Sequence, residues 1–167
     1  REHQIEPSLL QIEITETAII ENIEQAIGTL ERLRASGVRI SVDDFGTGHS
    51  SLSYIKRFNV DTLKIDRSFV HSLPDSADDM AIVAAVIAMG RSMRMCVVAE
   101  GVETDAQAAV LRELGCNEIQ GYLLARPMPG ADFAAWLLEY NEGRSRRHSR
   151  NRFSDTNPIT QFSLLDA

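Results

Sequence analysis

The sequence has few cysteines and no long apolar run, and each shortage excludes a class of protein. Cys96 and Cys116, its two cysteines, form neither a Cys-x-x-Cys motif nor a disulfide framework, and each adjoins an apolar segment where free cysteine serves as a small hydrophobe. No apolar run reaches the length that crosses a membrane, and no signal peptide precedes the first periodic segment. We therefore expect a cytoplasmic domain, and this leaves open an inner-membrane anchor elsewhere in the parent protein.

Positive charge is scarce in most of the chain. Of 17 basic and 24 acidic residues, five and three fall in residues 141–167, which leaves 12 against 21, a net charge of −9, for residues 1–140. A body this negative repels phosphate backbones unless a cation mediates, so we expect no nucleic acid polymer as a partner. The stretch RSRRHSRNRF at 144–153 has no acid and no periodicity, so residues 143–167 are expected to form a disordered, Arg-rich tail.

The rest of the chain alternates strand-like and helical segments, with the 44% hydrophobic and 25% charged residues typical of a globular domain. Such alternation predicts parallel βα units in an α/β fold. The strand centres are mostly apolar, as expected when both faces of a sheet are covered. Strands are expected at 9–14, 38–42, 62–69, 95–99 and 118–125, and helices at 17–36, 50–58, 78–93, 104–115 and 132–140.

Polar residues that do not suit strands lie at or near the C-terminal ends of these predicted strands. In parallel α/β folds and in barrels that edge binds ligands and carries catalytic residues. We therefore expect one site that draws residues from all five strands. They are Glu13 and Glu16 after the first strand, Asp43 and Asp44 after the second, Lys64 and Asp66 on the third, Glu100 and Glu103 after the fourth, and Gln120 on the fifth.

Two pairs within this set carry most of the information. Asp43 and Asp44 precede Phe-Gly-Thr-Gly and could form a simple turn, but adjacent carboxylates repel unless neutralised and can bind two cations. Their strand context favours metal. Glu13 and Lys64 each stand between apolar strand residues and need a buried partner. An ion pair would satisfy both, and Lys64 could also orient a phosphate or an attacking water.

The other candidates also have structural alternatives. Glu16 can stabilise a helix start, Glu100 can cap a turn or act as a ligand or base, and Gln120 can be a satisfied core amide or contact a phosphate. The whole set has no suitable catalytic cysteine and no Ser-His-Asp spacing, which excludes covalent Ser or Cys hydrolysis as the leading idea. Oxygen ligands favour Mg²⁺ or Mn²⁺, and a two-cation centre is suited to attack of water on a phosphodiester. The residues predict metal-dependent phosphoryl chemistry.

Five segments resemble, in order and spacing, the EAL domain of bacterial cyclic-di-GMP phosphodiesterases. The resemblance implies a TIM-like barrel that opens cyclic di-GMP to linear pGpG with two Mg²⁺ or Mn²⁺ ions. It also implies a homodimer, and upstream sensory or GGDEF domains in the parent protein. The segments are EITET at 13–17, DDFGTGHSS at 43–51, DTLKIDRSFV at 61–70, VVAEGVET at 97–104 and QGYLLARP at 120–127.

The resemblance also implies roles for individual residues. Glu13 and Asp43 correspond to ligands of the first metal, and Asp43 bridges to a second metal that Asp44 also binds. Glu100 corresponds to a glutamate beside the metals that is a ligand or general base.

Three further positions match in the same way. Lys64 corresponds to the lysine that positions the hydrolytic water, and Gln120 to the glutamine near the metal-bound water and phosphate. Glu16 corresponds to the residue that anchors the DFGTG loop, which links dimerisation, metal binding and activity.

The chain departs from the family in two respects. His49 stands where the family usually has tyrosine, a change we expect to be tolerated. The Glu of the EAL tripeptide and an Asn on the following strand, both first-metal ligands, lie upstream of Glu13 in the family, and this chain contains neither. A complete barrel needs about 250 residues. We therefore expect residues 1–142 to form an N-terminally truncated barrel of five βα units, weak or inactive alone in an active parent.

Two alternatives compete with an enzyme. Many EAL-like domains are receptors that hold the dinucleotide without cutting it, but the retained acidic set and Lys64 argue against a receptor. The other alternative is a truncated barrel that serves only for dimerisation. Heat of cyclic di-GMP binding would separate the two, because a dimerisation module should show none.

Overall fold

Five parallel strands form one sheet in the order β1-β2-β3-β4-β5, so each strand pairs with the next in the chain. The computed structural model describes residues 5–15, 23–47 and 52–147. The strands are β1 (Gln11–Thr15), β2 (Arg39–Phe45), β3 (Thr62–Ile65), β4 (Cys96–Ala99) and β5 (Glu118–Ile119). Within the described ranges β1 and β5 do not pair with each other, so the sheet is open.

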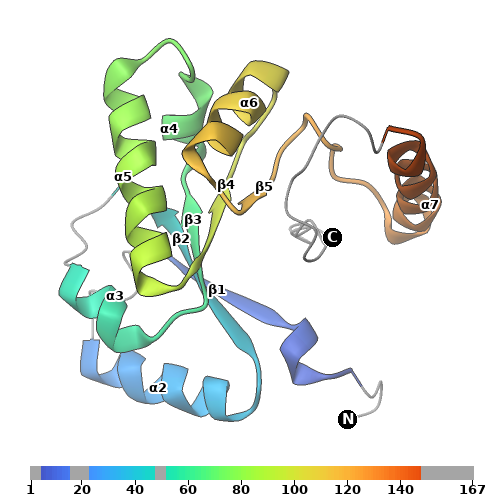
Figure 1. Cartoon of the computed structure of the whole chain (residues 1–167). Helices are drawn as coiled ribbons and strands as arrows, with labels where there is room; N and C mark the ends of the chain where they lie inside the picture. Colours follow the sequence, from blue (N-terminus) through green and yellow to red (C-terminus); the bar gives the residue numbers. More distant parts are fainter. Residues whose placement is uncertain (1–4, 16–22, 48–51, 148–167) are drawn as a thin grey trace.

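Helices connect the strands, as the predicted βα alternation requires (Figure 1). A short 3-10 helix, η1 (Pro7–Leu9), precedes the sheet. The helices are α2 (Ile23–Ala35), α3 (Leu52–Phe58), α4 (Arg67–His71), α5 (Ala77–Met93), α6 (Asp105–Leu114) and α7 (Gly130–Arg147). Contacts join α2 to β2, and α5 to both β3 and β4. None of the helices in the described ranges is long and apolar enough to cross a membrane.

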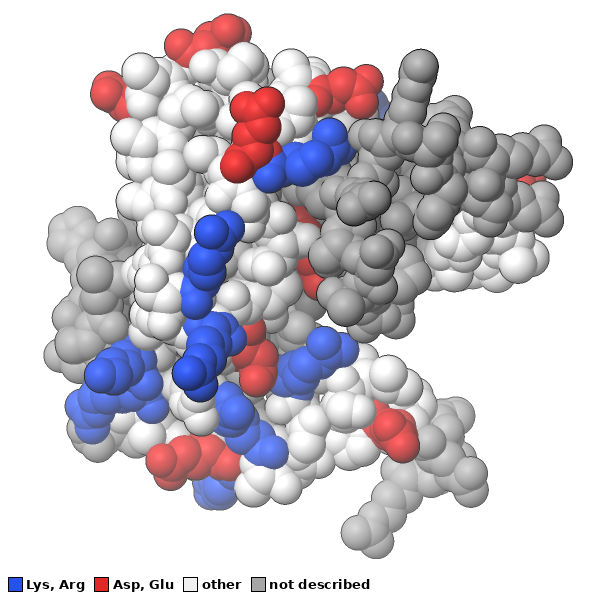
Figure 2. Space-filling view, viewed as in Figure 1, with Lys and Arg blue, Asp and Glu red and all other residues white. Residues whose placement is uncertain are grey.

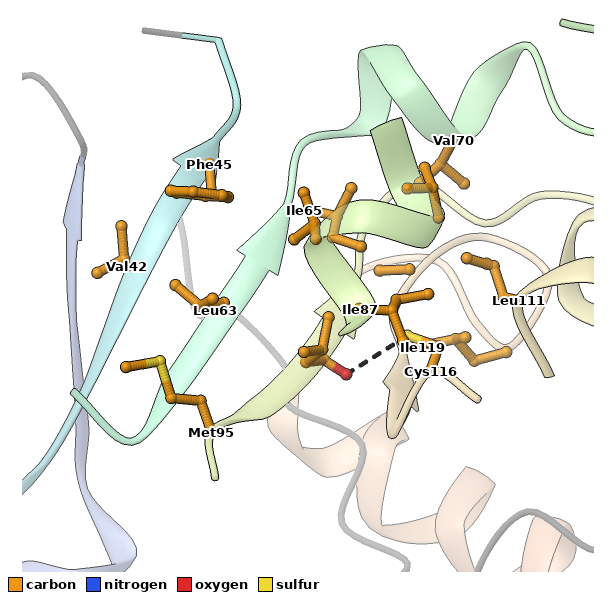
Figure 3. Close-up of a cluster of buried hydrophobic side chains, with 14 of the residues drawn as sticks. Val42, Phe45, Leu63, Ile65, Val70, Ile87, Met95, Leu111, Cys116 and Ile119 are labelled. Atoms are coloured by element: carbon orange, nitrogen blue, oxygen red, sulfur yellow. Dashed lines mark hydrogen bonds between the residues drawn. The ribbon is translucent and has the colours of Figure 1, made fainter. Parts of the chain in front are cut away.

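Strands β2 and β3 have one apolar side and one polar side. Alternate residues of a strand point to opposite faces, and paired residues of parallel strands share a face. Ile40 and Val42 of β2 therefore share the helix-facing side with Leu63 and Ile65 of β3, and all four belong to the hydrophobic core. Figure 3 shows Val42, Leu63 and Ile65 in this cluster with Met95 and Ile87. The expectation that both faces of the strands are covered is confirmed for β3, which is buried throughout, but β2 and β3 alternate apolar and polar residues more than expected.

The opposite side of the sheet carries polar residues although it too is shielded from solvent. Register places Ser41 of β2 beside Glu13 of β1 and Thr62 of β3. Ser41 and Lys64 are 0% and 1% exposed. Burying polar groups costs free energy unless they are paired, so this side needs specific partners that the apolar side does not.

Two predicted strands are shorter than expected. The segment expected at 62–69 is a strand only to Ile65, because the Asp66 side chain accepts a hydrogen bond from the Ser68 backbone N–H at 2.9 Å and caps α4. The segment expected at 118–125 is a strand only to Ile119. A turn follows, in which the Leu124 N–H donates to the Gly121 carbonyl at 3.0 Å.

The ends of the chain differ from expectation in smaller ways. Helix α7 runs from Gly130 to Arg147, so it extends beyond the predicted helix at 132–140 and through residues 143–147 of the predicted tail. The remainder of that tail, residues 148–167, lies outside the described residues. The start of the helix expected at 17–36 also lies outside them, and α2 is described from Ile23.

Candidate active site

Lys64 of β3 is the centre of the candidate site and contacts carboxylates from three other segments. Its Nζ lies 2.9 Å from Oε1 of Glu13, 3.2 Å from Oδ1 of Asp43 and 2.6 Å from Oε1 of Glu100. The strands β1, β2 and β3 provide the first three residues, and Glu100 follows β4 directly. The four residues come from four segments of the predicted edge. The register of the sheet therefore brings together residues that are far apart in the sequence.

Negative charge exceeds positive charge in this cluster. Burial alone would lower the pKa of Lys64, but hydrogen bonds to Glu100 and Glu13 and the charge of Asp43 raise it well above its ordinary value. Burial raises the pKa of Glu100, and Lys64 offsets only part of that rise. One ammonium group faces three carboxylates, so the cluster keeps an excess of negative charge that a cation would relieve.

A bulge in β2 places two consecutive carboxylates at the strand end. Val42 pairs with Leu63 and Phe45 with Ile65, so β2 uses one more residue than β3 over this span. Asp44 takes up this extra length with a left-handed φ of 54°, and its N–H donates to Oδ1 of Asp43 at 3.0 Å. Phe45 thereby returns to the apolar side while both aspartates stay at the edge.

Asp43, Asp44 and Glu100 have the geometry of a metal site. Each offers a carboxylate oxygen, and the three oxygens lie within 4.8 Å of one another. Burial raises the pKa of Asp44, and the negative charges of Asp43 and Asp66 raise it further. An all-carboxylate donor set with unrelieved negative charge fits a hard divalent cation.

Asp66 was expected at this edge, although the sequence assigned it no specific task. Its carboxylate lies near that of Asp44 and, in addition to burial, raises the pKa of Asp44. Burial would raise the pKa of Asp66, but hydrogen bonds from the hydroxyl and N–H of Ser68 lower it below the ordinary value. The sequence signal for Asp66 was its position two residues after Lys64, because alternate residues along a strand share one face.

Gln120 stands at the end of β5 with its backbone held on both sides. Its N–H donates to the Ala99 carbonyl at 2.8 Å, and its carbonyl accepts from the Val102 N–H at 3.0 Å. The side-chain Oε1 is buried and has no hydrogen-bond partner among the described residues. Gly121 permits this approach, because a Cβ there would lie 2.2 Å from the Val102 carbonyl oxygen and its φ is +156°. An acceptor in this position is open to a donor from a ligand.

Glu16 and Glu103 are the remaining glutamates of the predicted edge, and the structure describes only Glu103. Glu16 lies outside the described residues. Glu103 is described, and its backbone N–H donates to Oε1 of Gln107 at 2.8 Å. The same oxygen accepts from the N–H of Thr104, which with Gln107 forms the predicted capping box of α6. This arrangement fixes the loop that follows Glu100.

Basic side chains gather away from the carboxylates. Arg32 and Arg34 lie in the last turn of α2, Lys56 and Arg57 in that of α3, and Arg91 in that of α5. Figure 2 shows blue side chains over α3 and the nearby ends of α2 and α5. Cations suit helix C-termini, which carry partial negative charge. These charges therefore stabilise helices and do not neutralise the acidic edge.

Comparisons with known proteins identify the family of this chain. The family model described as "EAL domain" matches residues 1–127. Over 133 residues the chain is 50% identical to the bifunctional diguanylate cyclase/cyclic di-GMP phosphodiesterase MucR of Pseudomonas aeruginosa, which covers 80% of this chain and 19% of that protein. It is 52% identical over 131 residues to the cyclic di-GMP phosphodiesterase NbdA of the same organism, with 78% of this chain and 17% of that protein covered.

Solved structures give the same result. The complex of the MucR phosphodiesterase with c-di-GMP has a TM-score of 0.76 at 50% identity and covers 79% of this chain and 53% of that one. The manganese and cyclic di-GMP complex of Klebsiella pneumoniae BlrP1 has a TM-score of 0.70 at 38% identity, with 74% and 31% covered. The five-stranded sheet and its helices thus form part of a TIM-like barrel, and the chain spans about half of the MucR structure.

Proposed function

The chain belongs to the EAL domain family, and from this premise we propose that it supplies most of the active site of a phosphodiesterase that hydrolyses cyclic di-GMP to linear pGpG. The observation that carries the proposal is the buried Lys64 bound by carboxylates of Glu13, Asp43 and Glu100. The relatives MucR and NbdA of this chain are both named as cyclic di-GMP phosphodiesterases.

Two divalent cations, Mg²⁺ or Mn²⁺, complete the proposed site. Glu13 and Asp43 would hold the first, and Asp43 would be shared with the second, which Asp44 also holds beside Glu100. The cations would supply the positive charge that binds the phosphodiester and activates water. The manganese in the BlrP1 complex supports this choice of cofactor.

The side chains then have separate tasks in the hydrolysis. Lys64 orients the attacking water and opposes the charge that develops on the phosphate. Glu100 accepts the proton of the water as the new bond between the water oxygen and phosphorus forms. The bond from phosphorus to the 3′ oxygen breaks, and that oxygen takes up a proton from solvent to become a hydroxyl, while Glu100 returns its proton to solvent. Gln120 lies near the water and the phosphate, and its Oε1, which has no partner among the described residues, accepts a hydrogen bond from the water.

The setting of the site is also part of the proposal. We propose that the protein works in the cytoplasm as a homodimer and that Glu16 anchors the DFGTG loop. Upstream sensory or GGDEF domains would control it, an arrangement that the bifunctional name of MucR supports.

Chromatography of cyclic di-GMP incubated with Mn²⁺ tests the proposal, on this chain alone and on the full protein in which it occurs. We expect linear pGpG from the full protein, little or none from residues 1–167, and loss of product in the Glu100→Gln variant. A full protein that binds cyclic di-GMP in calorimetry but leaves it intact would instead be a receptor. Absence of binding heat would support the dimerisation module.

A further inference from the structure

Phe69 connects the helix after β3 to the segment that carries the two aspartates. Phe69 lies in α4, partly buried against the core, and its backbone N–H donates to the Asp66 carbonyl at 3.2 Å. The far edge of its ring faces Gly46. A Cβ built at Gly46 would lie 3.0 Å from Cε2 of Phe69 and 3.4 Å from Cζ. The ring therefore lies directly against a position that only glycine leaves open.

The segment from Asp43 to Thr47 holds an unusual backbone that this contact can secure. Asp44 and Gly46 both have positive φ, at 54° and 100°. A turn joins them, since the Thr47 hydroxyl donates to the Asp44 carbonyl at 2.9 Å. Few non-glycine residues adopt the left-handed region, although aspartate does so more readily than most, and the surrounding contacts decide whether the conformation persists. The direction of the Asp44 carboxylate therefore depends on the contacts that hold this segment.

The start of α4 meets this segment at two points. The Asp44 carboxylate lies near that of Asp66, which caps α4, and Gly46 packs on Phe69 one turn later. Two carboxylates of like charge repel each other, so the first point does not hold the segment in place. The contact of the Phe69 ring with Gly46 is apolar and supports the segment.

We infer that Phe69 is a positioning residue that holds the Asp43–Thr47 segment so that the Asp44 carboxylate stays in the cation site with Asp43 and Glu100. The inference rests on the proposed function only in taking Asp44 as a cation ligand. Phe69 also packs against the hydrophobic core. The next residue, Val70, is fully buried in that core at 0% exposure, so a change there separates loss of core packing from loss of support for the segment.

Mn²⁺ binding, followed by the electron paramagnetic resonance of free Mn²⁺, tests the inference in the full protein. Phe69→Ala should weaken Mn²⁺ binding about 10-fold, as loss of a residue that supports a ligand does. Phe69→Leu should restore part of the affinity because it keeps an apolar side chain against Gly46. Val70→Ala is the matched control: it should lower the melting temperature at least as much and leave Mn²⁺ binding unchanged.

Two further measurements make the outcome decisive. In an Asp44→Asn background, Phe69→Ala should have no further effect on Mn²⁺ binding, because the ligand it positions is gone. Hydrogen exchange at the Asp44 and Thr47 amides should be faster in Phe69→Ala while β2 and β3 stay protected, whether or not a cation binds.

Three results would overturn the inference: equal losses of Mn²⁺ affinity in Phe69→Ala and Val70→Ala, an undiminished effect in the Asp44→Asn background, or unchanged exchange at Asp44 and Thr47. A protein that binds Mn²⁺ in this pattern but does not hydrolyse cyclic di-GMP would refute the proposed function and keep the inference. If the Phe69→Ala variant hydrolyses cyclic di-GMP with the Mn²⁺ dependence of the wild type, the inference is refuted and the proposed function is kept.

Discussion

Leu63 and Lys64 are neighbours in β3, both are buried, and they are stabilised in opposite ways. Leu63 faces the helices and is 0% exposed within the hydrophobic core. Lys64 faces the other side and depends on ion pairs with Glu13, Asp43 and Glu100. Apolar packing is non-directional, whereas a buried charge requires specific partners. The comparison separates the side of the sheet that stabilises the fold from the side that carries the chemistry.

Replacing Lys64 should have the largest effect on the polar side. Lys64→Met keeps a similar volume but leaves three carboxylates without their counter-charge, and breaking a buried ion pair costs about 3–5 kcal/mol of unfolding free energy. The loss should shrink as the pH falls, because protonated carboxylates need no partner. Urea unfolding at pH 7 and pH 5 measures both quantities. A variant as stable as the wild type at pH 7 would show that the cluster is solvated and not truly buried.

Replacing Leu63 should have a somewhat smaller effect of a different kind. Leu63→Ala opens a cavity between β3 and α5 and should cost about 3 kcal/mol of unfolding free energy. Because no charge is involved, the loss should be the same at pH 7 and pH 5 and with or without Mn²⁺. Urea unfolding under these four conditions tests this independence. A loss that follows pH as in Lys64→Met would mean that the two sides of the sheet are coupled.

The contrast between the two sides could be predicted only in part from the sequence. Residue types at the strand ends predicted the acidic edge, and the need of Glu13 and Lys64 for buried partners predicted their proximity. The sequence left two roles open for Lys64, an ion pair with Glu13 or the orientation of a phosphate or water, because a sequence does not show distances. The polar side of β2 and β3 was missed, since Ser41 and Thr62 are small and their segments read as apolar.

The parts that could not be predicted depend on contacts between distant segments. The bulge at Asp43 and Asp44 arises from the pairing of β2 with β3, and local sequence contains no sign of it. The early end of β5 depends on Gly121 against Val102, a contact between separate loops. Asp66 was placed on the strand expected at 62–69, and only the structure shows that it caps α4.

The smallest effect concerns the pH dependence of the metal-free protein. The pKa values of Asp44 and Glu100 are raised, so the folded state binds protons more readily than the unfolded state at these two groups. Stability should therefore rise as the pH falls through the raised pKa values, until it levels near the ordinary values of 3.8 and 4.5. Lys64 adds no slope there, because its raised pKa removes stability only at alkaline pH.

A divalent cation should replace the protons and reverse this trend. Mn²⁺ binds the ionised carboxylates, so at 100 times its dissociation constant it should stabilise the protein at pH 7 by about 2.7 kcal/mol and progressively less at lower pH. Melting temperatures between pH 4.5 and 7, with EDTA and with Mn²⁺, measure the two opposite slopes. Asp44→Asn should flatten both, whereas Leu63→Ala should shift both curves downward without changing their slopes. Parallel curves with EDTA and Mn²⁺ would contradict the assignment of the acidic edge as a cation site, because protons and cations would then not compete for the same carboxylates.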